Sequence, residues 1–185
     1  MARDLLGALL VRDSDGGRAV GRIVEVEAYD GPDDKASHAR AGLTKRTTPM
    51  FGEVGHAYVY LIYGMHECLN VVAYDEALAP AGAVLLRALE PLEGVDLMRE
   101  RRTRAADPDP RLCAGPARLC QALAVSRDLN GHDLTVGTGL WIAAGEGVPS
   151  SGVSSGRRIG VDYAGDWAQR PWRFWITDHP SVSRG

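Results

Sequence analysis

Apolar and polar residues alternate in short stretches along this chain, and glycine, proline or polar turn residues separate the stretches. This period of two is typical of half-buried β-strands. We expect strands over the following ranges: 10–12, 19–29, 57–63, 68–74, 83–89, 140–143, 157–161 and 173–176. In the longest of these strands, the side chains of Glu25, Glu27 and Tyr29 share one face.

Fewer segments have the period of a helix, and most of them lie in the second half of the chain. We expect helices over these ranges: 2–9, 91–102, 116–124 and 166–169. The polar segment 30–50 and the Gly- and Ser-rich segment 145–156 are expected to be loops, and a loop as long as the first is usually functional. Strands dominate, and no repeat or domain boundary is visible. We therefore predict a single α+β domain, 1–185, with helices packed around a mixed or antiparallel sheet.

Composition narrows the class of protein. The 185 residues are 45% hydrophobic and 24% charged, which is ordinary for a globular protein that buries a full core. No apolar run approaches the length of a membrane span, and the apolar stretch at the N-terminus is too short, and too interrupted by Asp4, for a secretory signal. The three cysteines show no paired zinc spacing and fit a reduced cytosolic setting. Burial as small hydrophobic side chains explains them better than catalysis does.

The net charge of −3 does not indicate a nucleic-acid partner. Basic residues nevertheless cluster at 45–46, 99–104 and 157–158. Arginine-bearing loops of this kind can meet phosphates even on an acidic protein. Taken alone, a solvated surface explains each cluster better.

Three of the six tyrosines, Tyr58, Tyr60 and Tyr63, fall within six positions. The first two share a face of the expected strand, and the third precedes Gly64, where that strand should end. A strand that carries aromatic rings and turns with a ring at its tip suits stacking on bases or wedging between them. Taken alone, a tyrosine-rich core strand explains the segment better, because tyrosine is a good strand former.

Four polar residues are candidates for chemistry or recognition. Glu27, beside Tyr29, could hold and deprotonate a water, or could pair with an arginine as strand carboxylates ordinarily do. Arg87 ends an apolar run and needs an anionic partner, unless it snorkels at an edge. Asn70 either satisfies the backbone or reads a ligand edge, and His38 could donate to a ligand, bind a metal or cap a turn.

Known motifs exclude several reaction types. His56, His66 and Cys68 lie close in sequence, but neither His-Glu-x-x-His nor a paired-cysteine spacing is present, so we expect no metal site. The chain also has no Walker loop, no Gly-x-Gly-x-x-Gly and no Gly-x-Ser-x-Gly. Nucleotide hydrolysis, dinucleotide redox chemistry and the common serine hydrolase layout therefore lack support.

A further set of segments follows one order along nearly the whole chain. The segments are Arg22-Ile-Val-Glu-Val-Glu-Ala-Tyr29, Gly31-Pro-Asp-Asp-Lys-Ala-Ser-His38, Met50-Phe51, Tyr58-Val-Tyr-Leu-Ile-Tyr-Gly-Met65, Cys68-Leu-Asn70, Val84-Leu-Leu-Arg-Ala-Leu-Glu-Pro-Leu-Glu-Gly94, Gly115-Pro116, Arg118-Leu-Cys-Gln-Ala-Leu123, Arg158-Ile-Gly-Val161, Trp167-Ala168 and Pro171-Trp-Arg-Phe174. Each is weak alone, but the ordered set specifically resembles the alkyladenine (3-methyladenine) DNA glycosylase family, the monofunctional alkylpurine glycosylases.

The resemblance implies a catalytic group and a base pocket. Glu27 is expected to be the general base that activates a water, which Arg87 and a backbone carbonyl near Ile159 help to hold. Tyr29, His38 and Tyr60 are expected to sandwich the flipped base, with His38 bonding its edge.

The resemblance also implies how the site selects and holds its substrate. Asn70 is expected to crowd the exocyclic amino group of guanine and so to reject normal guanine, and Leu85 to line the same pocket. Tyr63 is expected to enter the duplex where the damaged nucleotide left, with Met65 and His66 beside it in the minor groove.

The implied protein is a DNA N-glycosylase of base excision repair, a single mixed α/β domain whose protruding β-hairpin inserts into DNA. It is expected to flip 3-methyladenine or 7-methylguanine, with hypoxanthine and ethenoadenine as further candidates, and to direct water at the sugar C1′. The expected partner of this monomer is double-stranded DNA containing damaged purines, with no membrane and no metal or organic cofactor. The expected location is the cytoplasm with chromosomal DNA, or the nucleus in a eukaryote.

Some features depart from the family pattern. Family members generally carry residues before the segment 2–7, so the chain is either N-terminally truncated or a short homologue. Glu67 is expected in the DNA-facing turn, where an acid could weaken binding, and the loop 41–49 matches poorly. Two other functions stay open. A non-catalytic binder of damaged DNA would not need Glu27 and Arg87 together, and a nucleoside hydrolase would not need Tyr63.

Overall fold

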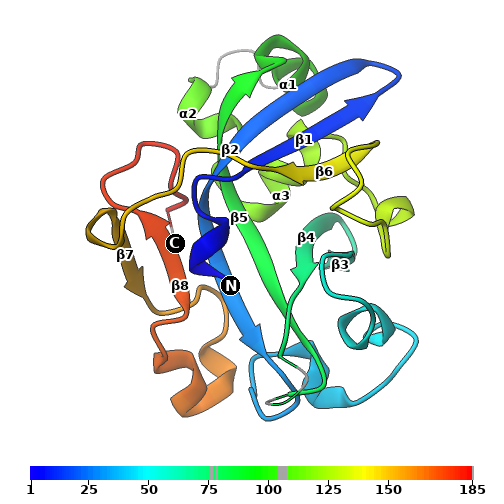
Figure 1. Ribbon diagram of the computed structural model, residues 1–185, viewed down its shortest axis with the longest axis vertical. Coiled ribbons are helices and arrows are strands. Elements are labelled where there is room, and N and C mark those ends of the chain that lie inside the picture. Colours follow the sequence, from blue (N-terminus) through cyan, green and yellow to red (C-terminus); the bar gives the residue numbers. More distant parts are fainter. Residues whose placement is uncertain (76, 78, 104–107, 185) are drawn as a thin grey trace.

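The computed structural model describes residues 1–75, 77, 79–103 and 108–184, and within these ranges eight strands form one sheet in which each strand pair is antiparallel (Figure 1). The strands are β1 Leu9–Ser14, β2 Gly17–Asp30, β3 Ala57–Ile62, β4 His66–Val72, β5 Gly82–Glu93, β6 Leu140–Ala143, β7 Val153–Gly156 and β8 Arg173–Ile176. Their order in the sheet is β3-β4-β5-β2-β1-β6, and β8 pairs with both β2 and β7. The α+β fold predicted from the sequence is confirmed.

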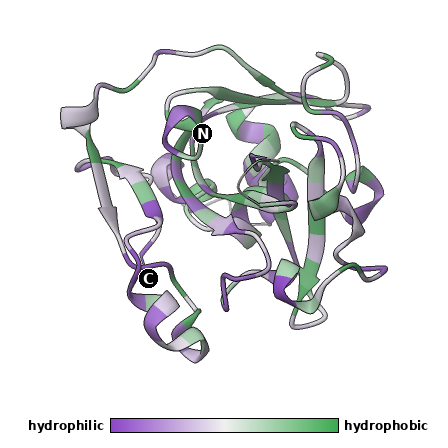
Figure 2. Ribbon diagram, turned by 60° about the horizontal axis from the view of Figure 1, so that its bottom comes forward, coloured by the Kyte–Doolittle hydropathy of each residue, from purple (hydrophilic) through white to green (hydrophobic). Residues whose placement is uncertain are grey.

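Helices within the described residues are short and pack around this sheet. The α-helices are α1 Val95–Arg102, α2 Asp109–Leu112 and α3 Pro116–Ala122, and the 3-10 helices are η1 Arg3–Leu5, η2 His38–Ala41, η3 Thr48–Phe51, η4 Arg127–Leu129, η5 Ser150–Gly152 and η6 Asp162–Gln169. Helix α3 packs against β4 and β5 and closes the main hydrophobic core. In Figure 2 the hydrophobic colour runs along the central strands. Arg104 of the basic cluster lies outside the described residues.

Strand β2 organises the sheet because it is paired along both edges. One edge pairs with β5, while the other pairs first with β1 and then, at Glu25–Glu27, with β8. The β2–β5 ladder is irregular at this point. Glu25 pairs with Ala88 and Val26 with Leu86, so Arg87 is an extra residue on β5. A bulge of this kind re-aims a side chain, and here it leaves Arg87 beside both glutamates of β2.

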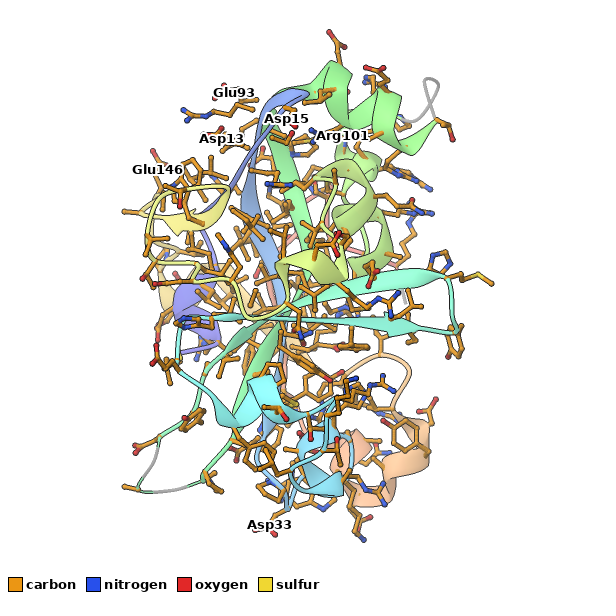
Figure 3. The ribbon with its side chains drawn as sticks, turned by 90° about the vertical axis from the view of Figure 1, so that its right-hand side faces the viewer. Asp13, Asp15, Asp33, Glu93, Arg101 and Glu146 are labelled. Atoms are coloured by element: carbon orange, nitrogen blue, oxygen red, sulfur yellow. The ribbon has the colours of Figure 1, made fainter. Side chains whose placement is uncertain are left out.

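The β3–β4 hairpin projects from the body of the molecule (Figure 3). Figure 3 also shows Asp13, Asp15, Glu93 and Glu146 on a part of the surface away from the projecting hairpin. These four carboxylates therefore lie away from the hairpin.

Several sequence-based expectations were wrong in detail. The helix expected from Pro91 begins at Val95, because β5 continues through Glu93 and Gly94 then turns with a φ of 70°. A Cβ on Gly94 would lie 2.3 Å from the Arg18 carbonyl oxygen, so only glycine fits this turn. The helix expected over 2–9 is limited to η1, because the chain from Leu9 pairs with β2 and β6.

The strand expected over 157–161 is absent. The closing strand is β7, Val153–Gly156, within the segment expected to be a flexible loop. The reason lies in the backbone of the next residues, because Gly160 has a φ of 76° and the N–H of Ile159 donates to a side chain instead of a strand. Strands β6 and β8 have the predicted ranges.

Candidate active site

Glu27 is fully buried in β2, and three donors surround its carboxylate. The Ile159 backbone N–H donates to Oε1 over 2.7 Å, and Arg87 Nη1 lies 3.2 Å from the same oxygen. The Tyr29 hydroxyl donates to Oε2 over 2.8 Å. Three charge-favouring contacts make an ionised carboxylate tolerable in this buried position. Oε2 keeps room for one more donor, such as a water.

Glu25 holds the other side of Arg87. Arg87 Nε donates to Glu25 Oε1 over 3.0 Å, and Arg173 Nε donates to that oxygen over 2.6 Å. The Ser183 backbone N–H donates to Oε2 over 2.7 Å, and the Ser183 hydroxyl donates to Oε1 over 2.9 Å. Burial acts against the charged guanidinium, but Glu27 and Glu25 together hold the pKa of Arg87 above its usual value. Arg87 is therefore a fixed cation between two carboxylates.

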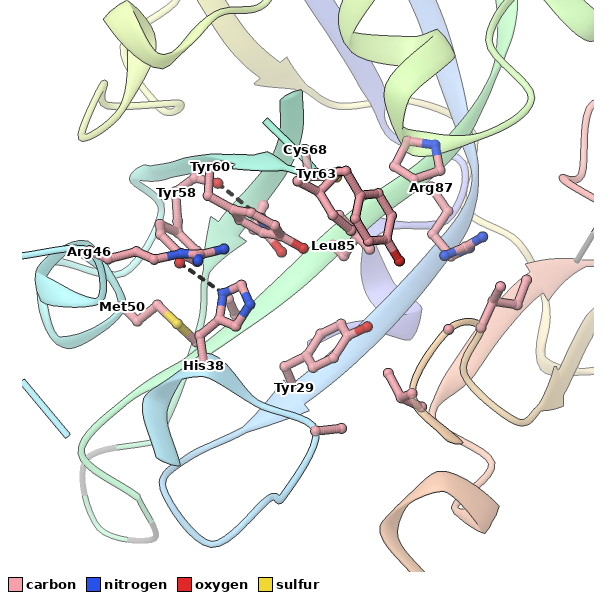
Figure 4. A pocket seen from close by; sticks show the side chains of 18 of the residues that line it. Tyr29, His38, Arg46, Met50, Tyr58, Tyr60, Tyr63, Cys68, Leu85 and Arg87 are labelled. Atoms are coloured by element: carbon pink, nitrogen blue, oxygen red, sulfur yellow. Dashed lines mark hydrogen bonds between the residues drawn. The ribbon is translucent and has the colours of Figure 1, made fainter. Parts of the chain in front are cut away.

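A pocket of about 220 Å³ lies next to Glu27. Tyr29, Arg87 and Ile159, the three residues that contact Glu27, all line the pocket, whereas Glu27 itself lies behind them. Figure 4 shows the side chains of Tyr29, His38 and Tyr60 around this space. The structure thus brings together the three aromatic side chains predicted to form the pocket, and they lie beside Glu27, the predicted general base.

The rings of the pocket contact one another edge to face or at a tilt. The centroids of His38 and Tyr60 are 4.6 Å apart with planes at 74°, and those of Tyr58 and Tyr60 are 5.3 Å apart. Burial raises the pKa of Tyr29 well above its usual value, and the nearby Glu27 charge adds to this. Burial also raises the pKa of Tyr60. Both phenols are therefore neutral at pH 7, and their rings are available for stacking.

His38 is a neutral imidazole at pH 7. Its Nδ1 lies 2.9 Å from the Tyr58 hydroxyl. Burial lowers its pKa to about 4, and the cationic Arg46 adds to this effect. A neutral ring has one donor and one acceptor nitrogen, so whichever nitrogen does not serve Tyr58 is free to bond a ligand edge. The metal and turn-capping alternatives have less support, because His38 stands at the pocket wall.

Asn70 and Leu85 face each other across β4 and β5 and line the same pocket. The Asn70 side-chain amide donates to the Tyr58 carbonyl over 3.0 Å, which fixes its orientation. Asn70 therefore satisfies the backbone, as one sequence interpretation allowed, and its place in the pocket lining keeps the reading of a ligand edge as a prediction.

Tyr63 stands at the tip of the β3–β4 hairpin and is 85% exposed. Tyr63 and Gly64 have φ values of 52° and 71°, and the Met65 N–H donates to the Ile62 carbonyl, which is the φ pattern of a type I′ turn. A bulky residue at positive φ is unusual and points to a functional constraint. Met65 is 68% exposed beside it, and His66 begins β4 and is half-buried.

Glu67 does not lie in the hairpin turn as expected. It is part of β4, where it pairs with Leu61, and its carboxylate lies 3.4 Å from Arg127 Nε. The expected acid at the tip is therefore a strand residue whose charge is balanced by a neighbouring arginine.

Four site residues were missed by sequence reasoning: Asp34, Arg46, Arg158 and Ser183. Arg46 lies with its guanidinium 5.3 Å from the Tyr60 ring centroid, in the loop that matched poorly. Arg158 belonged to a basic cluster for which the sequence favoured a solvated surface, but its side chain is fully buried against Asp34. Only the turn signal around Gly31 marks Asp34 in the sequence, and nothing marks its burial.

Neither a metal cluster nor a membrane-spanning helix is found in the described residues. No group of three or more His, Cys, Asp and Glu side chains there is arranged so that it could hold a metal ion. No helix of the described chain has the length and apolar character needed to cross a bilayer.

Comparison with known proteins gives one consistent match. A family model described as methylpurine-DNA glycosylase matches residues 1–180. A putative 3-methyladenine DNA glycosylase of Myxococcus xanthus is 51% identical over 185 residues, which cover 100% of this chain and 88% of the relative. A protein of the same description from Methanocella arvoryzae is 48% identical over 184 residues, covering 100% and 90%. DNA-3-methyladenine glycosylase of Homo sapiens is 42% identical over 193 residues, covering 99% of this chain and 63% of that protein.

Proposed function

The chain belongs to the methylpurine-DNA glycosylase family, and from this premise we propose that it flips an alkylated purine into the aromatic pocket and hydrolyses its N-glycosyl bond with a water activated by Glu27. The enzyme class, a hydrolase of N-glycosyl bonds acting in DNA repair, follows from the family itself. The base flipping, the range of lesions and the residue roles are the proposal.

The contacts of Glu27 are the observation that carries this proposal. A carboxylate held by the Ile159 N–H, the Tyr29 hydroxyl and Arg87 has a fixed orientation and one unused acceptor position on Oε2. A water bonded there gives its proton to Glu27 while its oxygen attacks C1′. The C1′–N bond breaks as the C1′–O bond forms, and the bonding electron pair leaves with the purine. The carbonyl of Ile159 is the expected acceptor for the second proton of the water.

The carboxylate also serves the transition state. The sugar develops oxocarbenium-like positive charge at C1′, and a nearby buried carboxylate stabilises that charge. Arg87 limits this benefit because it is cationic, but its charge is shared with Glu25, which offsets it. Glu25 therefore supports Glu27 by neutralising the cation between them.

The pocket suits a single flat base. Its volume of about 220 Å³ is below the roughly 300–1,000 Å³ usual for drug-sized ligands. Alkylation at N3 or N7 leaves a purine cationic, so 3-methyladenine and 7-methylguanine are good leaving groups and stack well on the Tyr29 and Tyr60 rings. Hypoxanthine and ethenoadenine are neutral and need a proton on the leaving base. The proposed role of Asn70, which lines the pocket, is to crowd the exocyclic amino group of guanine.

Tyr63 is proposed to fill the gap that the flipped nucleotide leaves. Extruding a base costs a few kcal/mol, and a ring inserted into the stack slows its return. An exposed tyrosine at the tip of a projecting hairpin supports this role, with Met65 and His66 flanking it in the minor groove.

The test is release of free base from duplex DNA that contains 3-methyladenine or hypoxanthine. We expect Glu27→Gln to lower single-turnover release about 10²–10⁴-fold, the usual range for a lost general base. Glu93→Gln, an exposed carboxylate of β5, is the matched control and should release base normally. Normal release by Glu27→Gln would remove Glu27 from its role. Binding of an abasic-site analogue without base release by the intact chain would favour a non-catalytic binder of damaged DNA.

We also propose that residues 1–185 act as one domain and as a monomer on chromosomal DNA. The sheet supports the first part, because β2 pairs with β8 as well as with β1, so both ends of the chain share one sheet. Light scattering of the chain alone and with a single-lesion duplex should give one protein per DNA, and a second protein in the complex would contradict it.

A further inference from the structure

Asp34 and Arg158 form an ion pair whose two side chains are fully buried. Arg158 Nη1 lies 2.5 Å from Asp34 Oδ2, and Nη2 lies 2.9 Å from Oδ1. The carboxylate also accepts the Ala36 N–H over 2.9 Å and the Asp30 N–H over 3.3 Å. The pair is therefore bidentate, and Asp34 is anchored to its own loop from both directions.

Arg158 makes equally extensive contacts on its side. Its guanidinium donates to the Ala28 carbonyl over 2.9 Å and to the Trp167 carbonyl over 3.1 Å. It also lies over two rings, with its central carbon 4.8 Å from the Tyr29 centroid and 5.1 Å from the Trp172 centroid. One side chain thus joins the end of β2, the loop after it and helix η6.

Two groups that contact Glu27 lie next to residues of this network in the chain. Arg158 is followed by Ile159, whose backbone N–H donates to Glu27 Oε1. Ala28 is followed by Tyr29, whose hydroxyl donates to Glu27 Oε2. The Arg158 network therefore holds the residues directly before Tyr29 and Ile159 in the chain, and these two supply the uncharged donors that orient Glu27, the proposed general base.

The same pair anchors the loop that carries a pocket ring. The Ser37 N–H donates to the Asp34 carbonyl over 2.8 Å, and His38 follows directly. The position of His38 at the pocket wall depends on where this loop is held against Arg158.

We propose that Asp34 and Arg158 are positioning residues, which hold the Ile159 N–H and the Tyr29 hydroxyl at the distances that keep Glu27 aimed at its water. A buried ion pair adds little net stability over a well-packed neutral replacement, because desolvation offsets the attraction, so stability alone is a weak reason for such a pair. A fixed fork with four acceptors and two stacked rings is instead suited to geometric precision. This inference rests on the proposed role of Glu27.

The main test is a double variant, Asp34→Asn with Arg158→Gln, which keeps a hydrogen-bonded pair but removes both charges. It avoids leaving one buried charge without its partner, because an unpaired buried charge destabilises the fold whether or not the pair positions Glu27. We expect a folded protein that binds an abasic-site duplex as the wild type does but releases base about 10- to 100-fold more slowly in single turnover, as misplaced catalytic groups do. A merely structural role would instead lower the free energy of unfolding without this selective loss of rate at intact DNA binding.

A second variant covers the case in which the double variant does not fold. Arg158→Lys keeps the buried cation opposite Asp34 but lacks the planar fork, so it should fold, bind DNA and show the same slow release. The control is Arg22→Gln with Glu90→Gln, which removes a partly exposed ion pair of 3.4 Å between β2 and β5 whose two residues do not line the pocket. It should leave both the single-turnover rate and the binding of the abasic-site duplex unchanged.

Normal release by folded Asp34 and Arg158 variants would overturn the inference, and so would loss of folding in both. Failure of the proposed function looks different, because the wild type would then release no base or Glu27→Gln would have no effect. The two results can therefore be told apart in one set of assays.

Discussion

Glu25 and Glu27 lie two residues apart on one strand, and both carboxylates are fully buried against the same arginine, but their remaining partners differ. Glu25 is bonded to Arg173 and Ser183, which are structural neighbours near the end of the chain. Glu27 is bonded to groups of the pocket wall. The two acids therefore have different functions, although their sequence contexts are nearly the same.

Glu25→Gln should primarily destabilise the fold. The change leaves Arg87 and Arg173 without their shared anion in a buried place, and breaking one partner of a buried pair costs about 3–5 kcal/mol. Urea unfolding should show this loss in the free energy of unfolding, whereas the exposed Glu93→Gln should change it little. A Glu25→Gln protein as stable as the wild type would contradict the structural role.

Tyr63→Asn should stabilise the free protein and impair its action on duplex DNA. Asparagine tolerates positive φ, so relief of the left-handed strain at Tyr63 should raise the free energy of unfolding by about 1 kcal/mol. Without the ring, release of hypoxanthine from duplex DNA should fall, while release from single-stranded DNA should change little. Val136→Asn, at an exposed residue that does not line the pocket, is the control. Equal losses on both DNA forms would argue against a wedge.

His38 should make the folded protein less stable in mild acid. Its pKa is about 4 in the folded protein, against an ordinary value of 6.5 in the unfolded chain, so the unfolded chain binds more protons between these values. Stability contributed by the neutral ring is then complete above pH 6.5 and declines as the pH falls toward 4. The measurement is the free energy of unfolding of the wild type and of His38→Gln over this pH range. As the pH falls, the difference between the two free energies should shift in favour of the variant. Parallel curves would contradict the lowered pKa.

Arg46→Ala should shift the lesion preference toward cationic bases. Arg46 lies over the Tyr60 ring and contributes to the low pKa of His38, so its field reaches the pocket and repels a positively charged purine. Removing it should raise the ratio of 7-methylguanine to hypoxanthine release about fivefold at low salt, equivalent to ~1 kcal/mol between unit charges in water. The ratio cancels general effects on DNA binding. Lys45→Ala, the neighbouring cation, is the control, and an equal shift there would show a non-specific effect.

Much of the fold could be predicted from alternation and turn signals. Strand β2 stood out because its apolar period is long and a Gly-Gly turn precedes it, and β6 and β8 had the predicted limits. The segment 157–161 misled because its apolar residues resemble a strand, while its backbone is committed to Glu27 and to a left-handed glycine. Local pattern does not reveal a carboxylate that takes a strand's hydrogen bond from far away in the sequence.

The candidate site could be predicted from the sequence only at residues whose type is unusual for the segment in which they lie. Glu27, His38 and Arg87 stood out as polar groups in apolar or functional segments. In the structure His38 and Arg87 line one pocket, and Glu27 contacts Arg87 behind the pocket wall. Asp34 and Arg158 did not, because a buried ion pair between residues 124 positions apart has the same sequence appearance as two surface charges. The burial of Asp34 and Arg158 follows from their pairing with each other in the fold, which residue type alone does not reveal.

Strand β2 is held on both edges where it carries Glu27, whereas His38, Arg46 and Tyr63 stand on a short 3-10 helix, a loop and a turn. The proposed general base is thus held by the sheet, whereas part of the proposed recognition surface lies outside it. If these roles hold, changes at these three positions would alter which damaged bases are accepted without altering how the bond is broken. A lineage exposed to new alkylating agents can therefore broaden or narrow its repair spectrum in small steps while the hydrolytic centre is inherited intact.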